Sequence, residues 1–159
     1  MDAGAMIRVG ILIGSPSDRP IADKIAQALG GLGIGSEVKV LSAHRTPDRV
    51  VAYIRKAEAA GVQVFVACAG MAAHLAGVVA AHTLRPVIGV PVASGPLAGV
   101  DALLATVQMP PGIPVATVAI DGGRNAAVLA ARILALHDPA VRQALADALA
   151  EDQARYDQP

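Results

Sequence analysis

Short apolar runs rich in β-branched residues alternate with longer segments of helical spacing along most of this 159-residue chain. Such runs indicate a parallel sheet covered by helices on both faces, because antiparallel strands with one wet face would alternate apolar and polar residues. The runs predict strands at Ile7–Ile13, Ser36–Leu41, Val62–Ala67, Val87–Val90 and Val115–Ile120. The segments between and after them predict helices at Pro20–Leu32, Pro47–Ala59, Ala72–Leu84, Val100–Gln108, Asn125–Leu136 and Pro139–Tyr156.

We expect these elements to form one doubly wound α/β domain, a three-layer α/β/α fold with five parallel strands in the order 2-1-3-4-5. Residues 1–159 are interpreted as a single domain, with an N-terminal extension at 1–6 and a C-terminal helical extension at 137–159. The last predicted helix carries an apolar face, which we expect to cover a neighbouring subunit rather than its own sheet. This face consists of Val141, Leu145, Ala148 and Leu149.

The composition favours an oligomer and argues against nucleic-acid binding. Hydrophobic residues make up 54% of the chain and charged residues 16%, which supplies more apolar surface than the core of a small monomer needs. The 13 basic and 13 acidic side chains balance, so there is no basic stripe for a phosphate backbone. The three aromatic residues, Tyr53, Phe65 and Tyr156, are too few for a base-stacking platform.

Other features predict a protein of the cytoplasm that does not enter a membrane. The segment before Ile7 is short and acidic and lacks the pattern of an export signal. Residues 59–84 contain no Asp, Glu, Lys or Arg, but their β-branched run and Ala-rich continuation fit a buried strand and helix better than a membrane span. The single cysteine, Cys68, is interpreted as a small buried hydrophobe, with a thiol nucleophile as the alternative.

Three corners of the predicted sheet carry the least ordinary residues of the chain. In open α/β sheets, ligands bind beyond the carboxyl ends of the strands, where the strand order reverses. The expected order brings together the corners that follow the first three strands, which are residues 14–18, 42–47 and 69–75. We therefore expect one cleft lined by these corners.

The first corner suits a phosphate group. It offers the hydroxyls of Ser15 and Ser17, the small Gly14 and the N–H groups that open the following helix. Asp18 would repel a phosphate and is better suited to accept hydrogen bonds from sugar hydroxyls. Helix capping by Asp18 or Ser17, with Pro20 in the first turn, is the alternative. Neither the dinucleotide fingerprint nor the NTP-binding P-loop motif occurs in the chain.

The second corner combines an imidazole with a cation. Thr46 and Pro47 form a typical helix start, and a helix N-terminus disfavours an adjacent cation unless an anion is bound. Arg45 is therefore a candidate phosphate partner, and Ser42 is a further candidate binding residue. His44 is a candidate general acid and base, because imidazole exchanges protons near neutral pH. A histidine that is merely hydrogen-bonded is the alternative.

The third corner is small and apolar apart from His74. Gly70 permits a planar ligand to approach the backbone, although a simple glycine-marked turn is the alternative. His82 lies too far around the predicted helix from His74 to share a metal ion with it, and His82 and His137 are interpreted as structural or solvent-facing. We expect no metal site, and no Ser-His-Asp order or nucleophile elbow indicates acyl transfer.

Six motifs follow one another between about Ile7 and Leu136. They are Gly14-Ser15-x-Ser17-Asp18, Ser42-Ala43-His44-Arg45-Thr46-Pro47, Ala69-Gly70-x-Ala72-Ala73-His74-Leu75, Gly89-Val90-Pro91-Val92, Leu97-x-Gly99-x-Asp101-x-Leu103-Leu104 and Val107-Gln108-Met109-Pro110-x-Gly112-x-Pro114-Val115-Ala116-Thr117-Val118. In this order and spacing, the chain resembles the purine-biosynthetic N5-carboxyaminoimidazole ribonucleotide mutase family, PurE. Several motifs at the right spacing are far more specific than any one of them alone.

The resemblance implies a flavodoxin-like fold, a cytoplasmic homo-octamer, and no metal or organic cofactor. It implies an isomerase that converts N5-carboxyaminoimidazole ribonucleotide to 4-carboxy-5-aminoimidazole ribonucleotide, by moving a carboxylate from the exocyclic nitrogen to ring carbon C4. The partner it implies is therefore a small ribonucleotide.

The resemblance also implies roles for individual residues. His44 is the general acid and base, Ser15 and Arg45 hold the phosphate, and Asp18 holds the ribose. The imidazole and carboxylate of the substrate face Gly70, Ala72 and Ala73, while His74 and Leu75 line the pocket. The further substrate-binding residues implied are Ser17, Ser42 and Ala69.

The chain departs from the family pattern at four positions. Met71, Ala76, Ala93 and Ala102 stand where the pattern has Gly, Pro, often Lys or Gln, and Ser, respectively. Met71 adjoins the expected carboxylate pocket and so bears on the carboxyl donor. Two alternatives remain open at this point: a direct carboxylase that adds CO2 to aminoimidazole ribonucleotide, and a non-catalytic ribonucleotide-binding module. The context of His74 favours the mutase.

Overall fold

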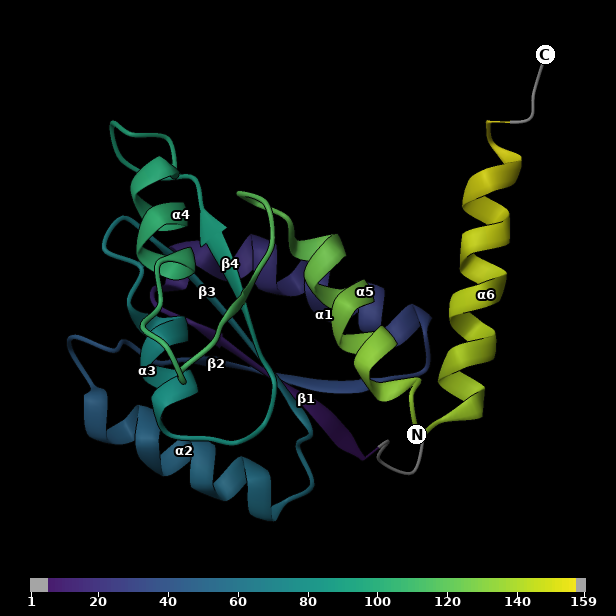
Figure 1. Ribbon diagram of the computed structural model, residues 1–159, viewed down its shortest axis with the longest axis horizontal. Helices are drawn as coiled ribbons and strands as arrows, with labels where there is room; N and C mark the ends of the chain where they lie inside the picture. Colours follow the sequence, from purple (N-terminus) through teal and green to yellow (C-terminus); the bar gives the residue numbers. More distant parts are fainter. Residues whose placement is uncertain (1–5, 157–159) are drawn as a thin grey trace.

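A computed structural model of the chain describes residues 6–156. Its five strands are all parallel and lie in the order β2-β1-β3-β4-β5 (Figure 1), which confirms the predicted sheet. The strands are β1 (Ile7–Ile13), β2 (Gly35–Val40), β3 (Val64–Gly70), β4 (Val87–Val92) and β5 (Ala116–Thr117). The α-helices are α1 (Arg19–Gly31), α2 (Pro47–Ala59), α3 (Leu75–Ala81), α4 (Val100–Val107), α5 (Gly123–Leu134) and α6 (Pro139–Ala154).

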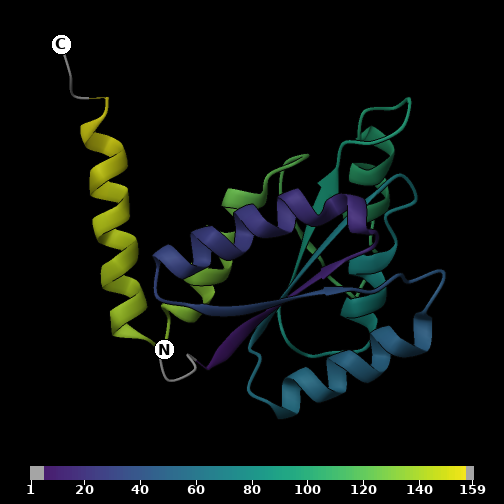
Figure 2. The same cartoon turned by 180° about the vertical axis from the view of Figure 1, so that it is seen from behind.

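Helices cover both faces of the sheet, with α1 and α5 on one side and α2, α3 and α4 on the other (Figures 1 and 2). Successive side chains of a strand point to opposite faces, so Ile11 and Ile13 of β1 pack with α1 and α5, whereas Leu12 packs with α2. Because both faces are dry, the buried parts of the central strands, such as Val9–Ile13 of β1 and Val64–Cys68 of β3, are apolar throughout rather than alternating.

The covering helices bury residues at helical spacing. Ile21, Ile25 and Leu29 lie on the inner face of α1, and Val50 and Ile54 lie on that of α2. Residues three or four apart share one helix face, so each helix presents a continuous apolar stripe to the sheet. Within residues 6–156, none of the helices is both long and apolar enough to cross a membrane.

The last strand is shorter than the expected Val115–Ile120. Only Ala116 and Thr117 form a regular ladder with β4, although the Val118 N–H still donates to the Gly89 carbonyl at 3.1 Å and the Asp121 N–H to the Pro91 carbonyl at 2.9 Å. Pro91 has no N–H to return a hydrogen bond. The chain therefore follows β4 to Asp121 without remaining a strand.

Helix α3 begins at Leu75 instead of the expected Ala72, and it ends at Ala81 instead of Leu84. A tight turn occupies residues 71–74, in which the Ala73 N–H donates to the Met71 carbonyl at 2.8 Å. Met71 has a positive φ of 54°, which no helix accommodates. An unpredicted 3-10 turn, η1 (Pro16–Asp18), likewise precedes α1. The late start of α3 and the turn η1 both lie directly after the carboxyl ends of strands.

Helix α6 stands at the edge of the molecule, away from the sheet (Figures 1 and 2). Val141 is buried against the core beneath α5 and Leu145 packs beside it, but Leu149 is 51% exposed. The helix therefore does not cover its own sheet, and its expected contact with a neighbouring subunit stays a prediction. Residues 1–5 of the expected N-terminal extension and residues 157–159 of the C-terminal extension lie outside the described residues.

Candidate active site

A cavity of about 280 Å³ lies at the carboxyl end of the sheet, where the corners after β1, β2, β3 and β4 meet. The structure brings together there ten of the twelve residues expected at the site. They are Ser15, Ser17, Asp18, Ser42, His44, Arg45, Ala69, Gly70, Ala72 and Leu75. Of the other two, His74 contacts His44 and Ala73 is buried beside the lining. The predicted convergence of the first three corners is therefore present in the fold.

The first corner is fixed by hydrogen bonds among Ser15, Ser17 and Asp18. The Ser15 hydroxyl accepts from the Ser17 N–H at 3.4 Å, and Asp18 Oδ2 accepts from the Ser15 N–H at 3.1 Å. This is a capping box around η1, so the capping expected of Asp18 exists, but it serves the 3-10 turn rather than α1. The Ser17 hydroxyl also donates to the Ser15 Oγ at 2.9 Å. Two hydroxyls are thus presented side by side.

The carboxyl of Asp18 is nearly buried, with 7% of the residue exposed. Burial raises its pKa from the ordinary value, and the hydrogen bonds from Ser15 and Ser17 oppose that rise. A carboxylate removed from water gains from every additional donor. Asp18 is therefore suited to accept hydrogen bonds from hydroxyl groups of a bound ligand.

The second corner is held by hydrogen bonds between its backbone and its own side-chain hydroxyls. The Thr46 hydroxyl accepts from the Ser42 N–H at 3.1 Å, and the Ser42 hydroxyl accepts from the Arg45 N–H at 3.2 Å. The Arg45 side chain is exposed beside the start of α2, and within residues 6–156 it forms no ion pair. A cation without a carboxylate partner, next to the positive end of a helix, is suited to bind an anion.

Two histidines from different corners form a hydrogen-bonded pair. His44 Nε2 lies 2.8 Å from His74 Nδ1, and the rings meet edge to face with centroids 4.9 Å apart. One of these two nitrogens must carry the shared hydrogen and the other must be a free acceptor, so the bond cannot form between two imidazolium ions. The contact therefore joins a hydrogen-bond donor on one ring to an acceptor on the other at the cavity, an arrangement suited to general acid–base chemistry.

The third corner supplies an apolar wall. Ala69, Gly70, Ala72 and Leu75 line the cavity, and no side chain larger than hydrogen fits at Gly70 because a Cβ there would collide with the Ser94 hydroxyl and lie 3.1 Å from the Val92 carbonyl. This glycine is required by close packing of the corner after β4 on the corner after β3.

Four lining residues were not among the expected binding residues, namely Gly14, Ala43, Met71 and Ser94, and of these only Ser94 lies outside the three corners expected to line the cleft. Ser94 follows β4. The predicted strand order could have identified it, because β4 neighbours β3 and the corner after β4 must therefore adjoin the cleft. Met71 was noted as adjoining the carboxylate pocket but not counted among the binding residues. Its positive φ costs a non-glycine residue about 1–2 kcal/mol, and its side chain lies against Gly95.

Cys68 lies near the carboxyl end of β3 and is fully buried in the core. Burial, with a smaller contribution from Asp18, raises the pKa of its thiol to about 12. The thiolate is the nucleophilic form, so Cys68 serves as an apolar core residue. Across the part of the chain that the structure describes, no group of three or more His, Cys, Asp or Glu side chains is placed to bind a metal ion.

Comparison with known proteins identifies the family. Residues 8–155 match the family model described as AIR carboxylase. An N5-carboxyaminoimidazole ribonucleotide mutase of Pyrococcus abyssi is 54% identical over 140 residues, covering 88% of this chain and 80% of the relative. The protein of the same name from Escherichia coli is 51% identical over 142 residues, covering 88% and 84%. The crystal structure of Treponema denticola PurE superposes with a TM-score of 0.87 at 33% identity, covering 93% of this chain and 92% of that one. On this evidence, and in agreement with the expected flavodoxin-like fold, the chain belongs to the AIR carboxylase family.

Proposed function

We propose that this protein is an isomerase of purine biosynthesis that converts N5-carboxyaminoimidazole ribonucleotide to 4-carboxy-5-aminoimidazole ribonucleotide. The observation that carries the proposal is the hydrogen-bonded pair of His44 and His74 facing an exposed Arg45 and a buried Asp18 across one cavity. The names of the relatives, which are 51–54% identical, support the same reaction.

The binding roles follow from the chemistry of each corner. The phosphate is placed against Arg45 and the Ser15 hydroxyl, with Ser17 and Ser42 beside them, at the positive end of a helix. The ribose hydroxyls donate to Asp18, whose carboxylate has the capacity to accept them. The aminoimidazole then lies over the third corner, along Gly70 and the small residues that follow it. These small or apolar residues are Ala69, Ala72, Ala73 and Leu75.

The first chemical step breaks the bond between the exocyclic nitrogen and the carboxylate carbon. Protonated His44 donates its proton to this nitrogen, and the electron pair of the breaking C–N bond stays on the nitrogen. The products at this stage are CO2 and aminoimidazole ribonucleotide, and His44 is left neutral. The hydrogen bond to His74 holds the ring of His44 in one orientation for this transfer.

The second step forms the carbon–carbon bond. C4 of the electron-rich imidazole attacks CO2, and neutral His44 then removes the C4 proton and becomes protonated again. No proton is gained or lost over the cycle, as an isomerisation demands. The apolar wall at Ala69, Gly70 and Ala72 suits neutral CO2, and keeping both fragments in one cavity favours recapture over escape.

The test is product formation by the purified protein. It is supplied either with N5-carboxyaminoimidazole ribonucleotide or with aminoimidazole ribonucleotide and bicarbonate. Conversion of the first substrate alone is the expected result. Efficient conversion of only the second would make the protein a direct carboxylase, and no conversion of either would favour a ribonucleotide-binding module.

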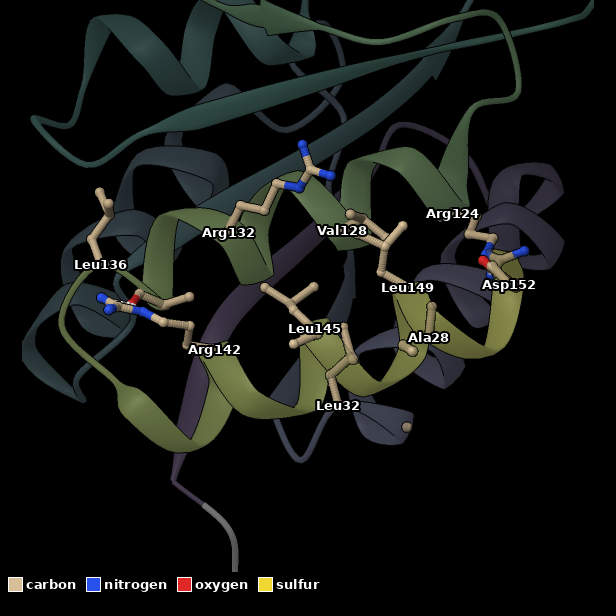
Figure 3. A pocket seen from close by; sticks show the side chains of 14 residues that line it. Ala28, Leu32, Arg124, Val128, Arg132, Leu136, Arg142, Leu145, Leu149 and Asp152 are labelled. Atoms are coloured by element: carbon tan, nitrogen blue, oxygen red, sulfur yellow. Dashed lines mark hydrogen bonds and ion pairs between the residues drawn. The ribbon is translucent and has the colours of Figure 1, made fainter. Parts of the chain in front are cut away.

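We further propose that the protein works in the cytoplasm as a homo-octamer in which residues 1–159 form a single domain. Support for assembly comes from an apolar groove of about 580 Å³ between α6 and the pair α1 and α5. Figure 3 shows the side chains that face this groove, among them Leu32, Val128, Leu145 and Leu149. Apolar surface of this extent is typically covered in a stable protein, and a second copy of the chain is the occupant that a homo-octamer supplies.

A further inference from the structure

Met71 reaches from one corner of the site to another. Its backbone belongs to the turn after β3, while its side chain extends to the loop after β4. A Cβ built on Gly95 would lie 3.6 Å from Met71 Cγ, 3.8 Å from Sδ and 3.9 Å from Cε. The whole thioether chain therefore lies along the backbone at Gly95, and it spans the gap between the two corners.

The same side chain belongs to the apolar end of the cavity. Met71 lines the cavity together with Gly70, Ala72, Leu75 and Ser94, and it is 55% exposed. Ala72 beside it is also exposed, whereas Leu75 is buried. A ligand placed over Gly70 would adjoin the Met71 side chain.

The backbone at Met71 directs the side chain to this position. With φ at 54°, the residue adopts the left-handed conformation, which glycine adopts without penalty and methionine does not. Strain of this kind gathers at ligand-binding sites. Methionine is also flexible and polarisable, so it covers irregular apolar ligands without a fixed shape.

We propose that Met71 covers the apolar end of the cavity and retains CO2 between the two steps, so that it is a specificity-determining residue. This inference rests on the proposed function. Once the C–N bond breaks, CO2 either forms the new bond to C4 or leaves through the mouth of the cavity, giving free aminoimidazole ribonucleotide. Met71 closes the second route, and the proton transfers at His44 do not depend on it.

The experiment follows the carboxyl carbon. N5-carboxyaminoimidazole ribonucleotide labelled with ¹³C in its carboxylate is converted in unlabelled bicarbonate, with carbonic anhydrase present to equilibrate escaped CO2. Mass spectrometry then gives the fraction of ¹³C retained in the product, and an enzyme-free sample corrects for spontaneous decarboxylation. The wild type is compared with the variants Met71→Ala, Met71→Gly and Met71→Leu.

Wild-type protein is expected to retain the label. In Met71→Ala and Met71→Gly, the fraction of ¹³C retained in the product is expected to be lower by about threefold or more, because CO2 exchanges with the solvent. Met71→Leu restores an apolar cover and is expected to retain most of the label. KM stays within about threefold in all variants, because the phosphate and ribose contacts are untouched. Met71→Ala removes the side chain but keeps the strained backbone, whereas Met71→Gly relieves it, so equal losses in both assign the effect to the side chain.

Two results would overturn the inference while leaving the proposed function intact. One is conversion with wild-type label retention in both truncated variants, and the other is a loss in Met71→Gly alone. Absence of conversion by the wild type would instead remove the proposed function and this inference together. Thermal unfolding of each variant checks that the fold is retained, with Met71→Gly expected to be at least as stable as the wild type.

Discussion

At the scale of single residues, neighbours in sequence have different surroundings and therefore different tasks. Arg45 is exposed at the start of a helix, whereas His44 contacts a partner 30 positions away, His74. The three resulting features come from two corners, since the anion partner and the proton carrier both follow β2 and the buried acceptor Asp18 follows β1. Two predictions belong to this scale.

Replacing His44 by Asn is expected to separate binding from chemistry. His44→Asn keeps a hydrogen-bonding side chain of similar width but cannot exchange protons near neutral pH, so turnover falls by about 10²-fold or more. Affinity for the ribonucleotide stays within several-fold, because its phosphate and ribose contacts remain. Isothermal titration and product assays measure the two effects. His82→Asn is the matched control, since His82 lies exposed outside the cavity; near wild-type turnover by His44→Asn would remove His44 from the mechanism.

Replacing Asp18 by Asn is expected to stabilise the fold and weaken binding. Because burial raises the folded-state pKa of Asp18 above its ordinary value of 3.8, the folded protein binds this proton more tightly than the unfolded chain does. The stability of the wild type relative to Asp18→Asn therefore falls as the pH rises from the ordinary pKa to the raised folded-state pKa. Above the folded-state pKa, the difference in stability between the two proteins reaches its full size.

The measurement for Asp18→Asn is thermal unfolding of both proteins between acidic and neutral pH, with ribonucleotide titration at neutral pH. Affinity is expected to fall by roughly 10- to 100-fold, which is the loss of a hydrogen bond to a charged group. A stability difference that does not change with pH, or unchanged affinity, would contradict the assigned role.

At the scale of elements, α6 is attached to the body at its first turn. Asp138 caps the helix, with Oδ1 accepting from the Ala140 N–H at 2.9 Å and the Val141 N–H at 3.2 Å, while Oδ2 accepts from Arg8 Nη1 at 2.6 Å. One side chain thus joins the helix start to β1. The hydrogen bond from Arg8 is the main cause that lowers the pKa of Asp138, and the backbone bond from Val141 adds to it.

Variants at Asp138 are expected to separate the cap from the ion pair. Asp138→Asn keeps a capping oxygen but loses the charge, and Asp138→Ala loses both, so stability should fall in the order wild type, Asn, Ala. Because the pKa of Asp138 is lower in the folded state, its carboxylate stabilises the fold at pH values above its ordinary pKa. This stabilisation disappears as the pH falls through the lowered folded-state pKa. Thermal unfolding against pH measures it. Asp147→Asn, on the exposed face of α6, serves as control; equal pH profiles for the wild type and Asp138→Asn would exclude the ion pair.

At the scale of the whole molecule, apolar surface stays uncovered at several places. The groove beside α6 is one, and α4 adds a second stripe at Val100, Leu104 and Val107, each about half exposed. Their spacing of three or four residues places them on one side of the helix. A chain with 54% hydrophobic residues and such faces is expected to assemble.

Light scattering is expected to give a mass near eight times the 16.0 kDa of one chain. Leu149→Asp places a carboxylate in the groove beside α6 and is expected to reduce this mass, because it removes apolar contact surface and a carboxylate is costly to desolvate. Gln153→Asp adds the same charge at an exposed position of α6 outside the groove lining and is expected to leave the mass unchanged. A monomeric wild type would contradict the assembly.

The sequence alone determined the sheet, because β-branched runs without polar alternation are stable only as strands buried on both faces, and that burial requires helices on each side. It also predicted which three corners meet, since 2-1-3-4-5 is the commoner order for five such strands and places the ends of β1, β2 and β3 together. Its motifs were sufficient to place ten residues at the cavity.

Only the tertiary structure decided the features that depend on contacts between distant residues. Ser94 joins the site because the corner after β4 packs on Gly70, and the hydrogen bond between His44 and His74 requires two corners to meet within 2.8 Å. The short β5 follows from Pro91 on the neighbouring strand, and the position of the Met71 side chain follows from a backbone turn with positive φ. Local patterns carry no information on such contacts, because the partner lies far away in sequence and its geometry is set by packing.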